Sequence, residues 1–280
     1  MGKPLERQAL DTLGKKWDRG KGTREKLLQN TREFARFVGE KYGLEKLENL
    51  KPKMVEAYIR DLQDRGKSAS TLAGKMTALR ELASAIGKQN IVPRANKDYG
   101  IERTRINPQV VDQDKIGQIR AALHARAGAG NKTAKMMVAA DALRESFGLR
   151  AKESLMSKDI IEKGGKLYLV VEGAKGGRPR ELAVDNEAKL RAVQMVAETS
   201  KALGSGTGRI IPPTMSLKEA YDAQRNDWKA LGGTRENNAN MHGERHAYAR
   251  DLDEKGAPKA EIMADLGHGE NRSPAAYGVK

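Results

Sequence analysis

The chain has 280 residues, of which 38% are hydrophobic and 32% charged, and its formal net charge is +15. This length suits one large domain or two ordinary ones, and the positive charge favours a polyanionic partner, of which nucleic acid is the commonest. No cysteine is present, so disulfides, thiolate zinc sites and cysteine nucleophiles are excluded.

The sequence contains no recognisable signal for a membrane or for secretion. No apolar run approaches the roughly 18–20 residues of a membrane span. The first residues also lack the apolar stretch of a secretion signal. We therefore expect a cytoplasmic protein with no membrane partner.

The first part of the chain predicts a small helical domain. Apolar residues recur at helical spacing after Thr23, Pro52 and Ser70. Thr23 and Ser70 are the expected helix caps, and Pro52 fits a first helical turn. These patterns predict a helical, DNA-binding domain over 23–90, preceded by a basic segment over 1–22.

This part of the chain also carries most of the excess charge. Residues 1–110 hold ten of the fifteen excess positive charges, which indicates a surface that binds phosphates. Three lysines are candidate contacts to the DNA backbone: Lys51, Lys53 and Lys75. The aromatic residues Phe34, Phe37 and Tyr58 lie among apolar neighbours, so we expect them in the core and not as platforms for base stacking.

A change of pattern divides the chain. Residues 91–111 are rich in Gly, Pro and Asn without a sustained period, which predicts a linker. Residues 112–280 predict a second domain that is mainly helical. Within it, two strand patterns at 166–172 and 180–184 flank a turn at 173–179 with basic residues, so we expect a small antiparallel hairpin.

Three of the four histidines fall within the last 40 residues, and such clustering favours a functional site. His242 and His246 share a helix face, so that with His268 they could hold zinc. The zinc-protease motif, however, has a glutamate where this chain has Gly243, and Arg245 would place a cation beside the metal. Both features argue against a metal site.

A phosphate site suits the same residues better. His242 and Arg245 are three residues apart and share a helix face. An arginine offers paired donors to two phosphate oxygens, and a histidine can donate a hydrogen bond and also exchange a proton. Together they could hold a phosphodiester from two directions.

With these residues and others along the chain, the sequence resembles the tyrosine recombinase, or phage integrase, family. That family has an Arg after a Gly-Leu pair, a Lys in a hairpin turn, a His-x-x-Arg-His segment, a Leu-Gly-His segment and a Tyr nine residues later. The matching residues, which follow in this order across 112–280, are Gly148-Leu149-Arg150, Lys175, His242 to His246, Leu266-Gly267-His268 and Tyr277. The helical part before them is similar to the family's core-binding domain.

The resemblance implies a fold and a set of roles. The fold is mainly α with a small antiparallel sheet, in two domains that form a C-shaped clamp around duplex DNA. Tyr277 would be the nucleophile that forms a 3′-phosphotyrosine, without metal, ATP or another cofactor. The other catalytic roles would be phosphate binding by Arg150 and Arg245, hydrogen bonding or proton transfer by His242 and His268, and protonation of the leaving oxygen by Lys175. Secondary candidates are Glu153, which would orient Arg150 or cap a helix, His246 as a supporting residue, and Arg178 and Arg180 as DNA-backbone contacts.

The function that the resemblance implies is site-specific recombination, with integration or excision of a mobile element. Its partners would be double-stranded DNA, further copies of the chain in a tetramer, and accessory bending or directionality proteins. Two alternatives stay open: a type IB topoisomerase-like or telomere-resolving enzyme, and a non-catalytic DNA-binding protein on the same scaffold.

Two features depart from the family pattern. Glu244 stands before Arg245, where the family usually has a large apolar residue, so we expect either altered packing of the helix start or a carboxylate near the cations of the site. The sequence also ends three residues after Tyr277, whereas family members commonly continue into a segment that docks on a neighbouring protomer. We therefore expect a different assembly contact or a shortened chain.

Overall fold

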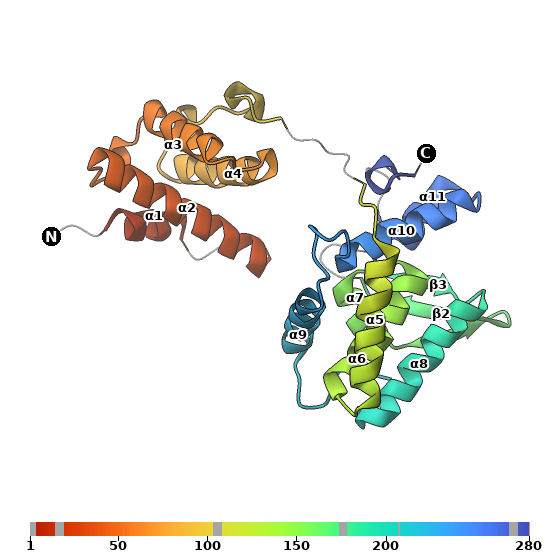
Figure 1. Cartoon of the computed structure of the whole chain (residues 1–280). Helices are drawn as coiled ribbons and strands as arrows, with labels where there is room; N and C mark the ends of the chain where they lie inside the picture. Colours follow the sequence, from red (N-terminus) through yellow and green to blue (C-terminus); the bar gives the residue numbers. More distant parts are fainter. Residues whose placement is uncertain are drawn as a thin grey trace. The chain divides into compact units, whose positions relative to one another are not determined.

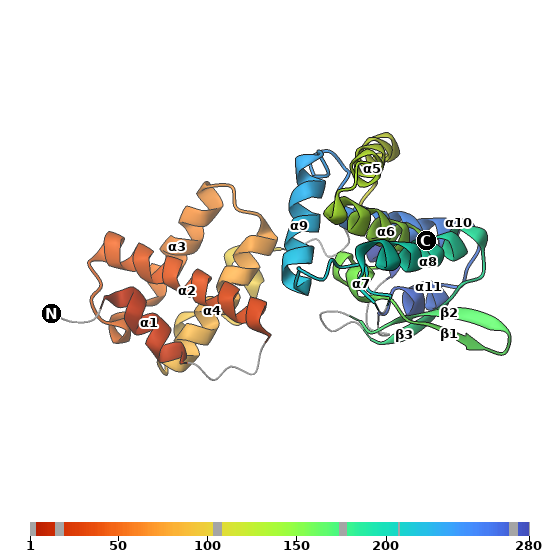
Figure 2. The same cartoon turned by 90° about the horizontal axis from the view of Figure 1, so that it is seen from below.

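The computed structural model describes residues 4–14, 20–102, 108–173, 178–206, 208–268 and 274–279. The chain divides into two compact units, Met1–Thr104 and Arg105–Lys280, here called the N-terminal and the C-terminal unit. Figures 1 and 2 show that the first contains helices only and that the second adds a small sheet. No helix in the described ranges is long and apolar enough to cross a lipid bilayer.

The N-terminal unit is a helical bundle around its own core. Phe34 and Tyr58 are 1% and 3% exposed, and their rings meet edge to face with centroids 5.2 Å apart. Phe37 is partly buried and packs on the same Tyr58 ring. The prediction of core positions is therefore confirmed for Phe34 and Tyr58, and Phe37 lies at the edge of that core. The elements of this unit are α1 (Leu5–Leu13), α2 (Lys21–Tyr42), η1 (Leu47–Asn49), α3 (Pro52–Asp64), α4 (Ala69–Ala85), η2 (Gln89–Ile91) and η3 (Asn96–Tyr99).

The starts of these helices test the predicted caps. Pro52 occupies the first position of α3 as expected, where its missing N–H costs nothing. Thr23 is not a cap, because α2 already begins at Lys21. Ser70 is not one either, because the hydroxyl of Ser68 accepts a hydrogen bond from the Thr71 amide and begins α4 two residues earlier.

The folded part of the N-terminal unit extends further than the predicted domain of 23–90. The predicted basic segment 1–22 contains α1, and the predicted linker 91–111 contains η3. Apolar side chains from both stretches are too widely spaced to show a period, yet they are buried in the core of this unit. They are Leu5, Ala9, Ile91, Val92 and Ile101.

The C-terminal unit is mainly helical with a three-stranded antiparallel sheet in the order β1-β2-β3. The expected hairpin is present as β2 (Lys166–Val171) and β3 (Arg180–Ala183), with Leu169 opposite Leu182. The edge strand β1 (Ile160–Lys163) was not predicted, because its side chains are mostly exposed and show no clean alternation. The helices are α5 (Gln113–Gly128), α6 (Lys132–Phe147), α7 (Ala151–Met156), α8 (Glu187–Leu203), α9 (Leu217–Ala230), α10 (Met241–Glu254) and α11 (Lys259–Asp265), followed by η4 (Pro274–Tyr277).

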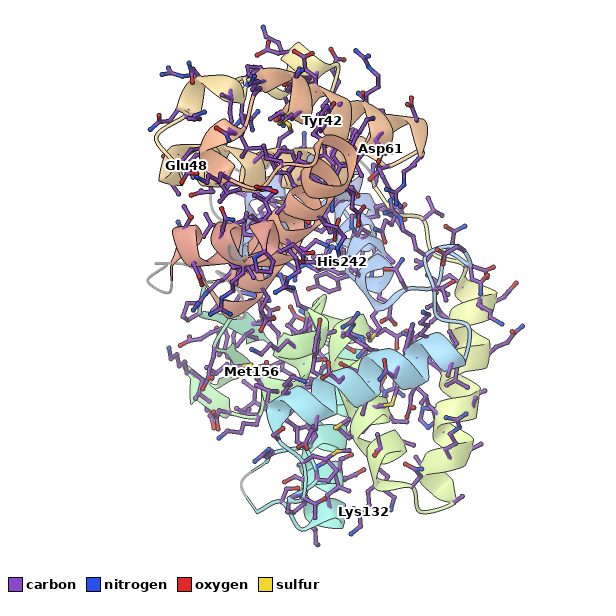
Figure 3. The ribbon with its side chains drawn as sticks, turned by 90° about the vertical axis from the view of Figure 1, so that its left-hand side faces the viewer. Tyr42, Glu48, Asp61, Lys132, Met156 and His242 are labelled. Carbon is purple, nitrogen blue, oxygen red and sulfur yellow. The ribbon has the colours of Figure 1, made fainter. Side chains whose placement is uncertain are left out.

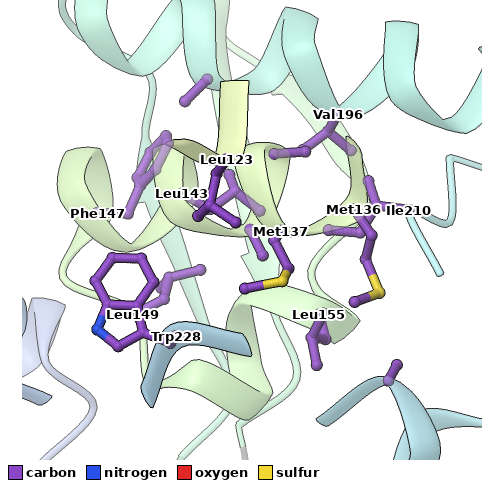
Figure 4. Close-up of a cluster of buried hydrophobic side chains, with 14 of the residues drawn as sticks. Leu123, Met136, Met137, Leu143, Phe147, Leu149, Leu155, Val196, Ile210 and Trp228 are labelled. Carbon is purple, nitrogen blue, oxygen red and sulfur yellow. The ribbon is translucent and has the colours of Figure 1, made fainter. Parts of the chain in front are cut away.

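Helix α6 forms the centre of this unit. Figure 4 shows its side chains Met136, Leu143 and Phe147 packed among residues of α5, α8 and α9. Trp228 of α9 is 1% exposed, and its indole N–H donates to the carbonyl of Ala239, 2.7 Å away. This bond ties α9 to the residue that precedes the cap of α10.

Gly148 ends α6 at the point where the candidate site begins. Its φ of +60° lies in the left-handed region, which favours glycine. A Cβ atom at this position would collide with the ring of Tyr248 on α10. The glycine therefore lets α10 approach the end of α6 closely.

Candidate active site

The start of α10 carries three of the predicted site residues. Asn240 caps this helix, because its side-chain oxygen accepts hydrogen bonds from the amides of His242 and Gly243, each at 3.1 Å. His242 is exposed on the first turn and lies well apart from Lys132 in the view of Figure 3, whereas Arg245 and His246 on the same helix are buried.

Arg245 connects α10 to two other segments of the site. Its Nη1 donates to the carbonyl of Gly148 at 2.7 Å, and its Nη2 donates to the carbonyl of Leu266. The residue is 1% exposed. Burial and the nearby Arg150 lower the pKa of Arg245 to about 10, so its guanidinium remains charged at neutral pH.

Tyr277 and His268 meet beside this guanidinium. The Tyr277 hydroxyl is hydrogen-bonded to His268 Nε2, which lies 3.2 Å from Arg245 Nη2. The Arg245 Cζ is 5.9 Å from the centre of the Tyr277 ring. Tyr277 is 4% exposed and packs with α10 and α11. The structure thus brings together the histidine and the tyrosine that the sequence places nine residues apart.

Glu153 is the anion that holds the arginines of the site. It accepts hydrogen bonds from the backbone and the guanidinium of Arg150, at 3.0 and 2.5 Å, and from Arg180 at 3.1 Å. Arg245 Nη1 lies 3.9 Å away. Burial alone would raise the pKa of Glu153, but the hydrogen bonds from Arg180 and Arg150 outweigh it and lower the pKa to about 2. Glu153 is therefore a permanent counter-charge for three arginines.

Arg180 differs from the expected surface contact with DNA. Its Nε donates to the carbonyl of Asp265 at 2.6 Å, its Nη2 bonds Glu153, and its side chain is only 8% exposed. The buried carboxylate of Glu153 draws this guanidinium inward. Arg180 consequently joins β3 to the end of α11, next to Gly267.

The other predicted DNA contacts are found in different surroundings. Lys51 and Lys53 are exposed at the start of α3, and Arg178 is exposed before β3. Lys75 differs from the expectation: it is 6% exposed, and its ammonium is paired with Glu33 of α2. Lys175, the predicted general acid, lies outside the residues that the structure describes.

His246 is a buried neighbour of the predicted nucleophile. Its ring centre is 4.7 Å from that of Tyr277 and 5.1 Å from that of His242. Its Nδ1 accepts from the backbone amide of Gln109 at 3.4 Å. Burial, followed by the charges of His242 and Arg250, lowers the pKa of His246 to about 4.

This environment predicts a neutral His246 over the physiological pH range. In a ¹⁵N-histidine NMR titration, with the resonance assigned through His246→Asn, we expect a midpoint near pH 4. Because the unfolded value is 6.5, the neutral ring contributes stability that is complete above pH 6.5 and is lost as the pH falls toward 4. A midpoint near 6.5 would contradict this prediction.

Glu244 does not place its carboxylate among the site cations. It pairs instead with Arg144 on α6 at 3.0 Å and with Arg120 on α5 at 2.9 Å. Of the two alternatives expected for this position, a carboxylate beside the cations of the site is therefore not what the structure shows. Two partners in the site, Gln109 and Asp265, were not predicted, and neither was Arg120 as the partner of Glu244. Each is far from its contact along the sequence, and no motif contains it.

The described residues do not bring His242, His246 and His268 together as a set of zinc ligands. Among the residues that the structure describes, no group of three or more His, Asp or Glu side chains is arranged to hold a metal ion. His268, the possible third zinc ligand, directs its Nε2 toward Arg245 and Tyr277. The arrangement of cations, imidazoles and one phenol suits an anionic substrate.

The helical fold with its small sheet, together with this cluster of Arg, His and Tyr, is typical of the tyrosine recombinase class. Family models agree: the model described as "Integrase" matches residues 108–251, and the one described as "Phage integrase, N-terminal SAM-like domain" matches residues 10–89. The chain belongs to the phage integrase family of tyrosine recombinases.

Individual relatives are distant. The tyrosine recombinase XerD of Caulobacter vibrioides is 25% identical over 248 residues, which cover 80% of this chain and 75% of XerD. A lambda integrase dimer bound to a COC′ core site superposes with a TM-score of 0.68 at 17% identity, over 98% of this chain and 75% of that one. XerH bound to a palindromic difH substrate gives 0.66 at 18% identity, over 90% and 75%. At these identities the solved structures establish the fold, which confirms the predicted mainly α architecture.

Proposed function

We propose that this chain is a site-specific DNA recombinase that cleaves and rejoins DNA through Tyr277. The observation that carries the proposal is the hydrogen bond between the Tyr277 hydroxyl and His268, beside the buried Arg245. A phenol needs cationic surroundings to attack a phosphodiester near neutral pH, because its ordinary pKa is about 10. Arg245 supplies a fixed charge at the required place, and Glu153 holds Arg150 nearby.

The reaction would follow from these positions. The Tyr277 oxygen attacks phosphorus, a P–O bond to a 3′-phosphotyrosine forms, and the bond to the 5′-oxygen breaks. His268 would accept the phenol proton, and Lys175 would protonate the leaving 5′-oxygen. Arg150, Arg245 and His242 would stabilise the charge on the non-bridging oxygens. Attack by a 5′-hydroxyl of another strand then restores a phosphodiester, so the bond energy is conserved without ATP.

The proposed partners follow from the charge of the chain and from its relatives. Lambda integrase has been solved as a dimer on a core site and as a tetramer on a Holliday junction. We propose that this chain also acts on duplex DNA as a tetramer, with integration or excision of a mobile element as the outcome. Lys51, Lys53 and Arg178 are exposed cations that could contact DNA phosphates.

A nicked suicide substrate tests this function. On duplexes that span the attachment site of the element encoding the chain, we expect a covalent protein–DNA adduct that resists denaturation. Tyr277→Phe should reduce the adduct at least about 10³-fold, since the nucleophilic oxygen is gone. Tyr221→Phe, on α9, is the matched control and should retain the adduct.

The other outcomes identify the alternatives. Specific DNA binding without an adduct in the wild type would support the non-catalytic binding protein and contradict the proposal. Plasmid relaxation without strand exchange would support the topoisomerase-like enzyme. Loss of adduct formation on addition of a chelator would contradict the metal-free reaction.

A further inference from the structure

One residue outside the family motifs makes three hydrogen bonds along α10. The Gln109 amide donates to His246 Nδ1 at 3.4 Å, and the Gln109 carbonyl accepts from Arg250 Nη1 at 2.6 Å. The Gln109 side-chain oxygen accepts from Asn240 Nδ2 at 3.0 Å. These partners are the cap, a buried site residue and a residue one turn further along the helix.

The neighbours of Gln109 press the same segment against the site. The Asp112 amide donates to the carbonyl of Asn238 at 2.9 Å. Val111 is 9% exposed, and a Cβ on Gly243 would lie 2.6 Å from its Cγ1. Residues 108–112 therefore form a strap across the first turns of α10, and the glycine at position 243 allows this close approach.

The strap also reaches the segment of the predicted nucleophile. A Cβ on Gly278 would lie 3.2 Å from the Cβ of Pro108 and 3.5 Å from the Cδ of Arg250. Gly278 follows Tyr277 directly. The strap thus contacts both the start of α10 and the residue that follows Tyr277, and both of these segments are far from the strap along the sequence.

The hydrogen bonds of Gln109 impose an orientation on both polar partners. Asn240 uses its oxygen for the amides of His242 and Gly243, so its nitrogen is left to donate to Gln109. Because His246 Nδ1 accepts from the Gln109 amide, a neutral ring must carry its proton on Nε2. The strap therefore selects one tautomer of a histidine that packs on the Tyr277 ring.

We infer that Gln109 is a positioning residue of this active site. It holds the first turn of α10 through Asn240 and keeps His246 as the Nε2–H tautomer beside Tyr277. The inference rests on the proposed function for its kinetic consequence, whereas the tautomer is a property of the folded chain without DNA.

Side-chain variants separate this role from a general contribution to folding. Gln109→Ala removes the acceptor for Asn240, and Gln109→Glu keeps it. In single-turnover reactions with the nicked substrate, we expect Gln109→Ala to slow adduct formation by about 10- to 100-fold, with DNA affinity changed by less than about twofold. Gln109→Glu should recover most of the rate. Gln113→Ala, at an exposed glutamine at the start of α5, is the control and should react as the wild type.

NMR of ¹⁵N-histidine protein without DNA provides the second readout. The wild type should show His246 protonated on Nε2 and unprotonated on Nδ1. An unchanged adduct rate in Gln109→Ala, or equal loss in the Ala and Glu variants, would overturn the inference. Protonation on Nδ1 would do so too. If the wild type forms no adduct, the proposed function fails. The NMR measurement of the His246 tautomer would then still test whether the Gln109 amide orients this ring.

Discussion

Replacement of Glu153 by alanine is expected to abolish adduct formation and to destabilise the C-terminal unit. The Arg245 side chain is 0% exposed and that of Arg180 is 8% exposed, and both would lose their buried counter-charge. Removal of one partner from a buried ion pair costs about 3–5 kcal/mol, because the remaining charge stays desolvated. Urea unfolding should show this loss, and single-turnover cleavage should fall by at least about 10³-fold because Arg150 and Arg245 lose their fixed positions.

Two further variants complete this experiment. Glu153→Gln keeps the volume of the side chain and an acceptor for the Arg150 amide but removes the charge, so it should lie between the wild type and Glu153→Ala. Glu187→Ala breaks an exposed ion pair with Arg191 on α8 and should change the stability by less than about 1 kcal/mol. If Glu153→Ala were no more disruptive than Glu187→Ala, Glu153 would not be the anchor of the arginines.

The same carboxylate predicts a pH dependence. Its pKa is about 2 in the folded chain and 4.5 ordinarily. A lowered folded value means that the contribution of Glu153 to stability is complete above pH 4.5 and is lost as the pH falls toward 2. The difference in unfolding free energy between the wild type and Glu153→Gln should therefore shrink over that window and stay constant above it.

Glu244→Leu is expected to destabilise the C-terminal unit by about 3–5 kcal/mol, even though leucine is closer to the family pattern. Four ionisable side chains from three helices form a network here: Arg120 of α5, Asp141 and Arg144 of α6, and Glu244 of α10. The last three are buried, whereas Arg120 is partly exposed. Burial and the neighbouring Asp141 raise the pKa of Glu244, and the charges of Arg144 and Arg120 oppose that rise. Arg144 Nη2 lies 2.7 Å from Asp141 and its Nε lies 3.0 Å from Glu244, while Arg120 bonds the same two carboxylates at 2.7 and 2.9 Å. With leucine at position 244, two arginines share one buried carboxylate.

A compensating change should recover much of this loss. In the double variant Arg144→Met with Glu244→Leu, one charge of each sign is removed and apolar side chains fill the space, an exchange that is often neutral for buried pairs. Urea unfolding of the wild type, both single variants and the double variant gives the coupling free energy. A double variant as unstable as the sum of the single ones would show that the two charges do not act as a pair.

The distance along the chain between contacting residues decides which parts of the molecule could be predicted from the sequence. The helices around Phe34 and Tyr58, the start of α3 at Pro52 and the β2–β3 hairpin depend on contacts between near neighbours, so their periodicity reveals them. The motif residues were equally visible, because Arg245 and its histidines occupy one helix start and His268 and Tyr277 lie a short, fixed distance apart.

Other features depend on contacts between residues that are distant along the chain. The inward turn of Arg180 toward Asp265 spans 85 residues, the bond of Gln109 to His246 spans 137, and the ion pair of Lys75 with Glu33 joins two helices. No local pattern distinguishes a lysine or arginine on the surface from one that a buried carboxylate draws inward. Hydrophobic periodicity and motif spacing therefore select the candidate residues of the site, whereas the packing of α10 against α6, α11 and the strap determines how the described ones are oriented and charged.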